Sequence, residues 1–315
     1  MSAPSAFRCK RVLPRLLLFV GGGIVTLAWC EFAFYRGEQG VFLPAMVLVY
    51  GFGCYLFFVV LVRTSAPYRH GLFLAAGLFG FVIEGVVVPV LYDTLPFSIV
   101  WTSLAWHGLI SVLFCLVVFR RWMRAWRWPA RLALCAGLGM AQGLWACYTW
   151  LNTDAGVFPA DVALIAPYTG QAVLGFGLFA AGHLVLDRVG AERIGVIGRD
   201  LWPVVGAIGG VWLLGQFWPR FPASLLLPAL GVLTLLALRR LAPGAAAADI
   251  LAPVPLGHCA VVPALPMCSI AAFAWGQQNG LIPTCTDQHS CAHLRIPMDL
   301  MRAGWAISLF QASQQ

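Results

Sequence analysis

The chain has 315 residues, of which 61% are hydrophobic and only 10% are charged, and its net charge is +8. This balance excludes an ordinary soluble globular protein, which would form about two domains at this length with a more mixed composition. The positive charge lies between alternate apolar runs and not on one patch or amphipathic face, so we do not expect nucleic acid as a partner. The composition predicts an integral membrane protein in contact with the lipid bilayer.

Eight apolar runs along the chain are long enough to cross a membrane. A spanning helix needs about 20 mostly apolar residues, and runs of this length exclude a β-barrel. The last two runs are short and contain prolines, so seven spans are an alternative. The predicted fold class is an all-α integral membrane protein, a bundle of about eight transmembrane helices. We expect the helices at residues 16–34, 41–62, 71–92, 97–119, 132–151, 162–186, 201–218 and 223–238.

The distribution of lysine and arginine predicts the orientation of this bundle. Sixteen of these residues lie before the first span and in every second connection after it, whereas the other connections contain only Arg36 and Arg220. Basic connections face the cytoplasm. We therefore expect the N-terminus and the C-terminus in the cytoplasm, and a multi-pass protein of a bacterial-type cell (inner) membrane.

The composition divides the chain into three parts. Residues 1–15 form a basic cytoplasmic N-terminus, residues 16–241 the transmembrane domain, and residues 242–315 a Pro-, Cys- and His-containing tail for which we expect low order. Residues 261–274 of the tail are apolar but short and interrupted by prolines, which favours an interfacial or loosely packed segment. The Cys and His residues of the tail match no zinc-binding spacing, and we expect no metal and no other cofactor.

Glu84 and His107 are the most informative polar residues, because an ionisable group inside hydrocarbon costs several kcal/mol and marks a functional site by default. They lie on the third and fourth predicted spans, which are joined by a short polar turn. Counted from that turn at about 1.5 Å per residue, both fall roughly 12 to 15 Å below the outer end, near the midplane. Helices with so short a link are antiparallel neighbours, so the carboxylate and the imidazole can meet.

The next hairpin repeats this arrangement with two amides. Gln142 lies nine residues before the end of the fifth span, and Gln171 lies nine after the start of the sixth. Thr102 and Ser103, about one turn above His107, add hydroxyl groups that need partners in a dry environment. Singly, each of these residues is most simply a hydrogen-bonding contact between helices. Together, their matched depth suggests groups that orient a substrate beside Glu84 and His107.

Two further patterns rank lower. His183 and Asp187 are four residues apart on one helical face, as paired ligands can be, but they lie at the cytoplasmic end beside Arg188, which favours a solvated helix cap. The glycines at 21–23, with Gly51 and Gly53, permit close contact between helices. We recognise no GxxxG pattern that predicts a pairing of helices.

Three functions fit these observations. The first is a transporter-like carrier of a proton or of a small or lipid-like solute, with Glu84 and His107 handling the proton or ligand. The second is a membrane-embedded enzyme with His107 as base or metal ligand, although most metal sites need three or four protein ligands. The third is a non-catalytic membrane assembly subunit. Soluble catalytic signatures, such as a P-loop or HExxH, are missing from the chain.

Overall fold

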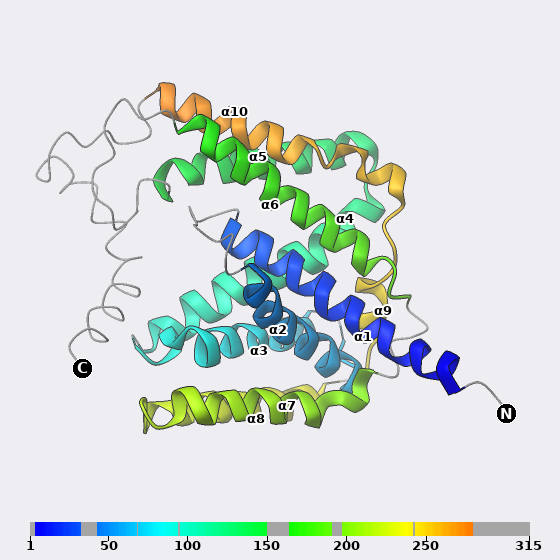
Figure 1. Ribbon diagram of the computed structural model, residues 1–315, viewed down its shortest axis with the longest axis vertical. Helices are drawn as coiled ribbons and strands as arrows, with labels where there is room; N and C mark the ends of the chain where they lie inside the picture. Colours follow the sequence, from blue (N-terminus) through cyan, green and yellow to red (C-terminus); the bar gives the residue numbers. More distant parts are fainter. Residues whose placement is uncertain are drawn as a thin grey trace, which may run out of the picture. The chain divides into compact units, whose positions relative to one another are not determined.

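The structure is a computed structural model, and every secondary-structure element that it describes is a helix (Figure 1). The chain divides into two compact units. The first contains Met1–Leu27, Phe42–Arg121 and Ala181–Val254, and the second contains Ala28–Val41, Trp122–Ala180 and Pro255–Gln315. The structure describes residues 4–32, 43–67, 69–93, 95–149, 164–190, 197–241 and 243–279.

The helices follow the apolar runs of the sequence, and those of 3₁₀ or π type carry the letter η. In chain order they are α1 (Pro4–Leu27), η1 (Ala28–Phe32), α2 (Leu43–Arg63), α3 (His70–Val82), η2 (Ile83–Val87), η3 (Pro89–Tyr92), η4 (Ile99–Val118), α4 (Phe119–Ala125), α5 (Trp128–Thr149), α6 (Ile165–Leu186), α7 (Leu201–Trp212), η6 (Leu213–Phe217), η7 (Ala223–Leu225), α8 (Leu226–Arg240), α9 (Ala246–Ile250), η8 (Leu256–Val261) and α10 (Ala264–Gln278).

Within the described residues, 8 helical segments are long and apolar enough to cross a membrane, which confirms a polytopic helical membrane protein. Seven of them coincide with predicted spans, and the eighth, Leu256–Gln278, lies in the predicted tail. Helix α5 contains residues 132–149 of the predicted span at 132–151, borders residues that the structure does not describe, and is not among the eight. The segments are Val12–Phe32, Leu43–Arg63, His70–Val87, Ile99–Ala125, Ile165–Leu186, Ile197–Phe217, Ala223–Arg240 and Leu256–Gln278.

Helix α10 differs from the interfacial or loosely packed segment that we predicted. Pro263 precedes the helix and Pro266 lies in its first turn, where a proline sacrifices no backbone hydrogen bond. The two prolines therefore start this helix and do not interrupt it. Because our count of crossings ended at residue 238, α10 adds a long helix that the count did not contain, and the side on which each end of the chain lies stays a prediction. Residues 280–315, with the Cys and His residues of the tail, lie outside the described residues.

In the second unit, α5 and α10 lie side by side and run in the same direction (Figure 1). A methyl group at Gly139 would overlap the carbonyl oxygen of Leu265, and one at Gly143 would overlap that of Ser269. The two backbones can touch because glycine has no side chain at these two positions. The two glycines form a GxxxG pattern, the usual signature of close helix packing in membranes. Our expectation that no such pattern pairs helices was wrong.

Replacing Gly143 by alanine is expected to lower the stability of the protein by about 1–3 kcal/mol, because α10 must move away from α5 to admit the methyl group. Gly137, on the same helix, has no heavy atom within 4 Å of an added Cβ. Gly137→Ala is therefore a matched control and is expected to be neutral or slightly stabilising. Thermal unfolding of the purified protein in detergent micelles measures both effects. Equal melting temperatures for the two variants would contradict this packing.

In the first unit, α1 and α2 touch through the glycines that the sequence singled out. An added methyl group at Gly23 would lie 2.8 Å from the Cα of Gly51, and one at Gly22 would overlap the sulfur of Cys54. The predicted close contact between these helices is confirmed. On another face of α2, an added methyl group at Gly53 would lie 2.9 Å from the ring of Phe79 in α3, so α2 also packs closely against the helix that leads to Glu84.

Candidate functional site

Glu84 and His107 meet in the interior of the first unit. The Nε2 atom of His107 lies 2.7 Å from Oε1 of Glu84, and the two residues are 4% and 6% exposed, respectively. The prediction that the two side chains can meet is confirmed. This distance is that of a hydrogen bond between the two side chains, whose donor depends on which nitrogen of the histidine carries the proton.

A close contact between backbones sets the position of the pair. A methyl group at Gly80 would overlap the carbonyl oxygen of Ser103, and one at Gly108 would lie 3.4 Å from the carbonyl oxygen of Ala76, so α3 and η4 run antiparallel. Glu84 follows Gly80 by one turn and His107 follows Ser103 by one turn. Their Cα atoms thus lie on opposite sides of the Gly80–Ser103 contact. We had predicted that the two residues lie at one depth.

The side chains close this offset because of the direction in which helical side chains lean. They tilt toward the N-terminus of their own helix. In two antiparallel helices, Glu84 and His107 therefore lean toward each other and meet near the level of Gly80. The predicted contact is correct, but the predicted register of the two helices was wrong by about a turn on each helix.

The helix that carries Glu84 is irregular around this residue. It changes from α to π winding at Ile83–Val87 and then breaks at Val88, whose backbone is extended (φ −110°, ψ 99°). Its partner η4 is also π-wound, since the amide of Phe119 donates to the carbonyl oxygen of Phe114, five residues earlier. π-turns occur often at functional sites, and broken helices surround the binding sites of many transporters.

Two buried oxygen atoms at this site have no hydrogen-bond partner among the described residues, Oε2 of Glu84 and Oγ of Ser103. Nearly all buried polar atoms in proteins are paired, so such atoms point to a proton or a polar group that arrives during function. Thr102 behaves differently, because its hydroxyl donates to the carbonyl oxygen of Ser98 at 2.8 Å, within its own helix. Of the two hydroxyls that we predicted, Ser103 is the better candidate.

Two aromatic rings flank the imidazole of His107. The ring centroids of Tyr50 and Phe79 lie 6.1 and 6.2 Å from that of the histidine, and both aromatic residues are buried. They shield the pair from lipid and strengthen its electrostatic interaction by lowering the local dielectric constant. We did not predict Tyr50, because a single aromatic residue in an apolar run does not stand out.

The two predicted amides lie in the second unit, where each has a protein partner. Oε1 of Gln142 accepts a hydrogen bond from the hydroxyl of Tyr168 at 2.7 Å and another from Ser269. Nε2 of Gln171 donates to the carbonyl oxygen of Phe32 at 3.0 Å. These contacts tie together α5, α6, α10 and η1, as expected for polar residues that hold helices together. Their role in orienting a substrate stays a prediction.

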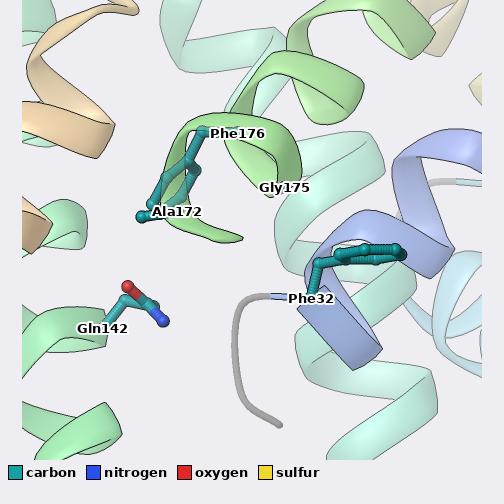
Figure 2. Close-up of a pocket in the computed structure, with 5 residues that line it drawn as sticks. All are labelled: Phe32, Gln142, Ala172, Gly175 and Phe176. Carbon is teal, nitrogen blue, oxygen red and sulfur yellow. The ribbon is translucent and has the colours of Figure 1, made fainter. Parts of the chain in front are cut away.

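A small pocket adjoins Gln142 in the second unit (Figure 2). It has no room for even a water molecule, whereas typical ligand sites enclose roughly 300–1,000 Å³. The pocket is therefore a small packing gap and does not mark a ligand site. Its lining residues are Phe32, Gln142, Ala172, Gly175 and Phe176.

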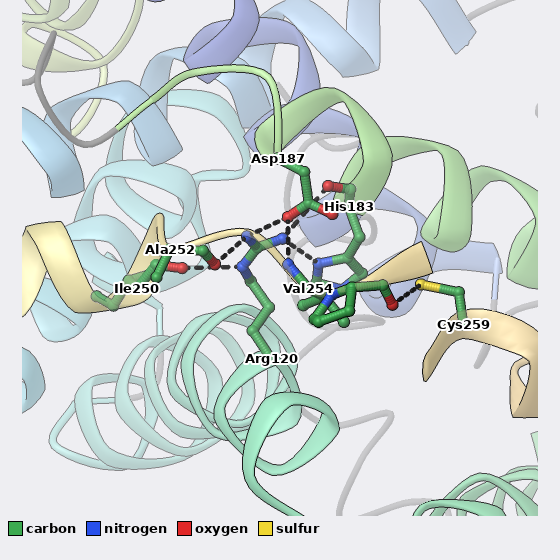
Figure 3. Close-up of polar contacts among 8 residues, drawn as sticks. Arg120, His183, Asp187, Ile250, Ala252, Val254 and Cys259 are labelled. Atoms are coloured by element: carbon green, nitrogen blue, oxygen red, sulfur yellow. Dashed lines mark hydrogen bonds and ion pairs between the residues drawn. The ribbon is translucent and has the colours of Figure 1, made fainter. Parts of the chain in front are cut away.

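A second buried charge lies in the first unit, where Arg120 is 0% exposed (Figure 3). Its guanidinium donates to the carboxylate of Asp187 at 2.5 Å and to the carbonyl oxygens of Ile250 and Ala252 at 2.9 and 3.1 Å. It also lies 3.4 Å from Nδ1 of His183. We call the side chains of Arg120, His183 and Asp187, together with the carbonyl groups of Ile250 and Ala252, the Arg120 cluster. They join α4, the end of α6 and the segment after α9.

The Arg120 cluster corrects our interpretation of His183 and Asp187 as a solvated cap. His183 is buried and Asp187 faces the arginine. Arg120 was counted in the sequence only as one of several basic residues after the fourth span. A run of arginines does not show which of them turns inward.

Two further ion pairs lie near the two ends of the α7–η6 helix, in the same unit. Near its start, Arg15 contacts Asp200 at 2.6 Å, and Tyr55 donates to the same carboxylate at 2.5 Å. After its end, Arg220 forms an ion pair with Asp93. Each pair joins residues that the predicted topology placed on the same side of the membrane. The spans of this unit are therefore mutually consistent.

No group of three or more His, Cys, Asp or Glu side chains that could bind a metal occurs in the part of the chain that the structure describes. Fold and site together define a polytopic helical membrane protein with a buried carboxylate–imidazole pair. No family model matches the chain, and comparisons with curated proteins and with solved structures find no similar protein.

Proposed function

We propose that this protein is a membrane carrier in which Glu84 and His107 take up and release a proton, coupled to the movement of a small or lipid-like solute. The observation that carries the proposal is the buried 2.7 Å contact between the two side chains, beside a carboxylate oxygen that has no hydrogen-bond partner in the part of the chain that the structure describes. Ionisable residues this deep in a helical bundle are costly and typically serve proton relays or ion pathways.

The chemistry assigns a role to each atom. Oε1 of Glu84 and Nε2 of His107 share one proton, so Oε2 is the atom that accepts a second one. Accepting it removes the negative charge and weakens the hold of Glu84 on His107, which favours a different helix arrangement. The broken helix at Val88 supplies a place where the backbone can change at low cost.

A membrane-embedded enzyme is the second candidate function, and one observation favours it. The carboxylate of Glu84 holds the ring of His107 by one nitrogen, as carboxylates orient the histidine bases of hydrolases. The hydroxyl of Ser103, one turn away on the same helix, finds no hydrogen-bond partner in the described ranges. The described residues show no hydrogen bond from that hydroxyl to the imidazole, so the carrier ranks first.

Reconstitution into proteoliposomes tests the proposal. A membrane potential is imposed with a potassium ionophore, and internal pH is followed with a trapped dye. Wild-type protein is expected to move protons faster than protein-free vesicles, and Glu84→Gln is expected to return the rate to that background. A wild-type rate equal to the background, in vesicles shown to contain folded protein and loaded with a panel of lipids and small solutes, would refute the carrier. Hydrolysis of a lipid in the panel would instead support the enzyme.

A further inference from the structure

We infer that the ion pair between Asp93 and Arg220 closes an access route to Glu84 from the turn between η3 and η4. The inference rests on the proposed function, since it concerns how protons reach the site. We call Asp93, Arg220, Tyr92 and Trp212 the hairpin lock. All four lie in the first unit, and none of them figured among the predicted site residues.

The ion pair connects the surface of this unit to its interior. The side chain of Arg220 is 28% exposed, whereas that of Asp93 is 3% exposed. A buried carboxylate held by a partly exposed guanidinium is an arrangement that opens when the arginine moves outward. Closing it stabilises Asp93, because an unpaired charge in that position would be desolvated without compensation.

Tyr92 connects the hairpin lock to Gly85, the residue next to Glu84. Its hydroxyl donates to the carbonyl oxygen of Gly85 at 2.8 Å and accepts from Nε1 of Trp212 at 3.2 Å. Burial raises the pKa of Tyr92, so the hydroxyl keeps its proton and remains a donor at neutral pH. The hairpin lock therefore covers the carbonyl group of Gly85, which lies just before the helix break at Val88.

Gln216 contacts a second carbonyl group of the turn that holds Glu84. Its side-chain amide reaches the carbonyl oxygen of Val86 at 3.5 Å, from the π-turn η6 that precedes the loop of Arg220. Polar groups therefore follow one another from Arg220 to the turn that holds Glu84. In the other direction along α3, the backbones of Gly80 and Ser103 touch, so the route to Glu84 lies on the side of the lock.

Cysteine labelling tests this route without relying on transport. Val86, two residues after Glu84, is buried, at 7% exposed, whereas its neighbour Val87 is 41% exposed. Val86→Cys is treated with a small charged thiol reagent in the full chain, in detergent and in proteoliposomes, with wild-type protein as the baseline for native cysteines. Adding Arg220→Gln is expected to raise the labelling rate of Val86→Cys about fivefold or more, because a partly buried ion pair no longer holds the lock shut. Labelling of Val87→Cys is expected to stay unchanged.

Further variants separate the lock from general loosening. Asp93→Asn is expected to raise labelling like Arg220→Gln, and Arg220→Lys, which keeps the charge, to restore most of the protection. Arg15→Gln breaks the ion pair with Asp200 at the other end of the α7–η6 helix and is expected to leave labelling unchanged. The inference is overturned if Arg220→Gln leaves labelling unchanged, or if Arg15→Gln raises it equally. Labelling that rises in a protein without proton flux would support the lock and refute the carrier.

Discussion

Replacing Asp187 by leucine is expected to lower the free energy of unfolding by about 3–5 kcal/mol, the usual cost of removing one partner of a buried charge pair. Arg120 is completely buried and depends on Asp187 for the compensating charge. The carboxylate also accepts a hydrogen bond from the backbone N–H of Val254 at 3.2 Å, so its loss removes one of the contacts that hold the segment after α9. Chemical denaturation of the protein in mixed detergent micelles measures the change.

The neighbouring residue supplies the control for this prediction. Arg188 is exposed, and Arg188→Leu is expected to change stability by less than about 0.5 kcal/mol. The double variant Arg120→Leu/Asp187→Leu is expected to be more stable than Asp187→Leu alone, because no unpaired charge remains buried. A double variant that loses the sum of the two single losses would show that the residues do not depend on each other.

The sequence predicted the membrane fold well because one physical term dominates it. Seven of the described candidate spans coincide with predicted ones, since about 20 apolar residues in a row have few other stable locations. The segment at α10 was misjudged because Pro263 and Pro266 were taken as interruptions, although a proline in the first turn of a helix costs little. Its packing on α5 depends on the absence of side chains at Gly139 and Gly143, a pattern that we overlooked.

The candidate site was only partly predictable, for a related reason. Glu84 and His107 stood out because a titratable group is rare in an apolar run, and the short hairpin limited where they could be. The Arg120 cluster did not stand out, because an arginine after a span usually faces water. The sequence does not show which arginine side chain turns inward. The hairpin lock joins Asp93 and Arg220, 127 residues apart, which only the fold brings together.

Glu84→Gln and His107→Gln are each expected to reduce proton flux about 10²- to 10⁴-fold, the range in which positioned acid–base groups contribute. The amide of Glu84→Gln still offers an oxygen to His107 but no longer accepts a proton at neutral pH. Because it also removes a buried charge, it is expected to leave the unfolding free energy unchanged or slightly raised. Flux and stability are thus expected to separate, which a purely structural role of the pair would not allow.

Ser111 supplies the matched control on the same helix. It is also fully buried, four residues after His107, but its hydroxyl donates to the carbonyl oxygen of Trp106 at 2.9 Å. Ser111→Ala is expected to retain most of the flux. Because the two site residues act as one unit, the double variant Glu84→Gln/His107→Gln is expected to be no slower than either single variant. If the single variants keep wild-type flux, the pair only holds the helices together, and if their losses multiply in the double variant, each residue serves a separate step.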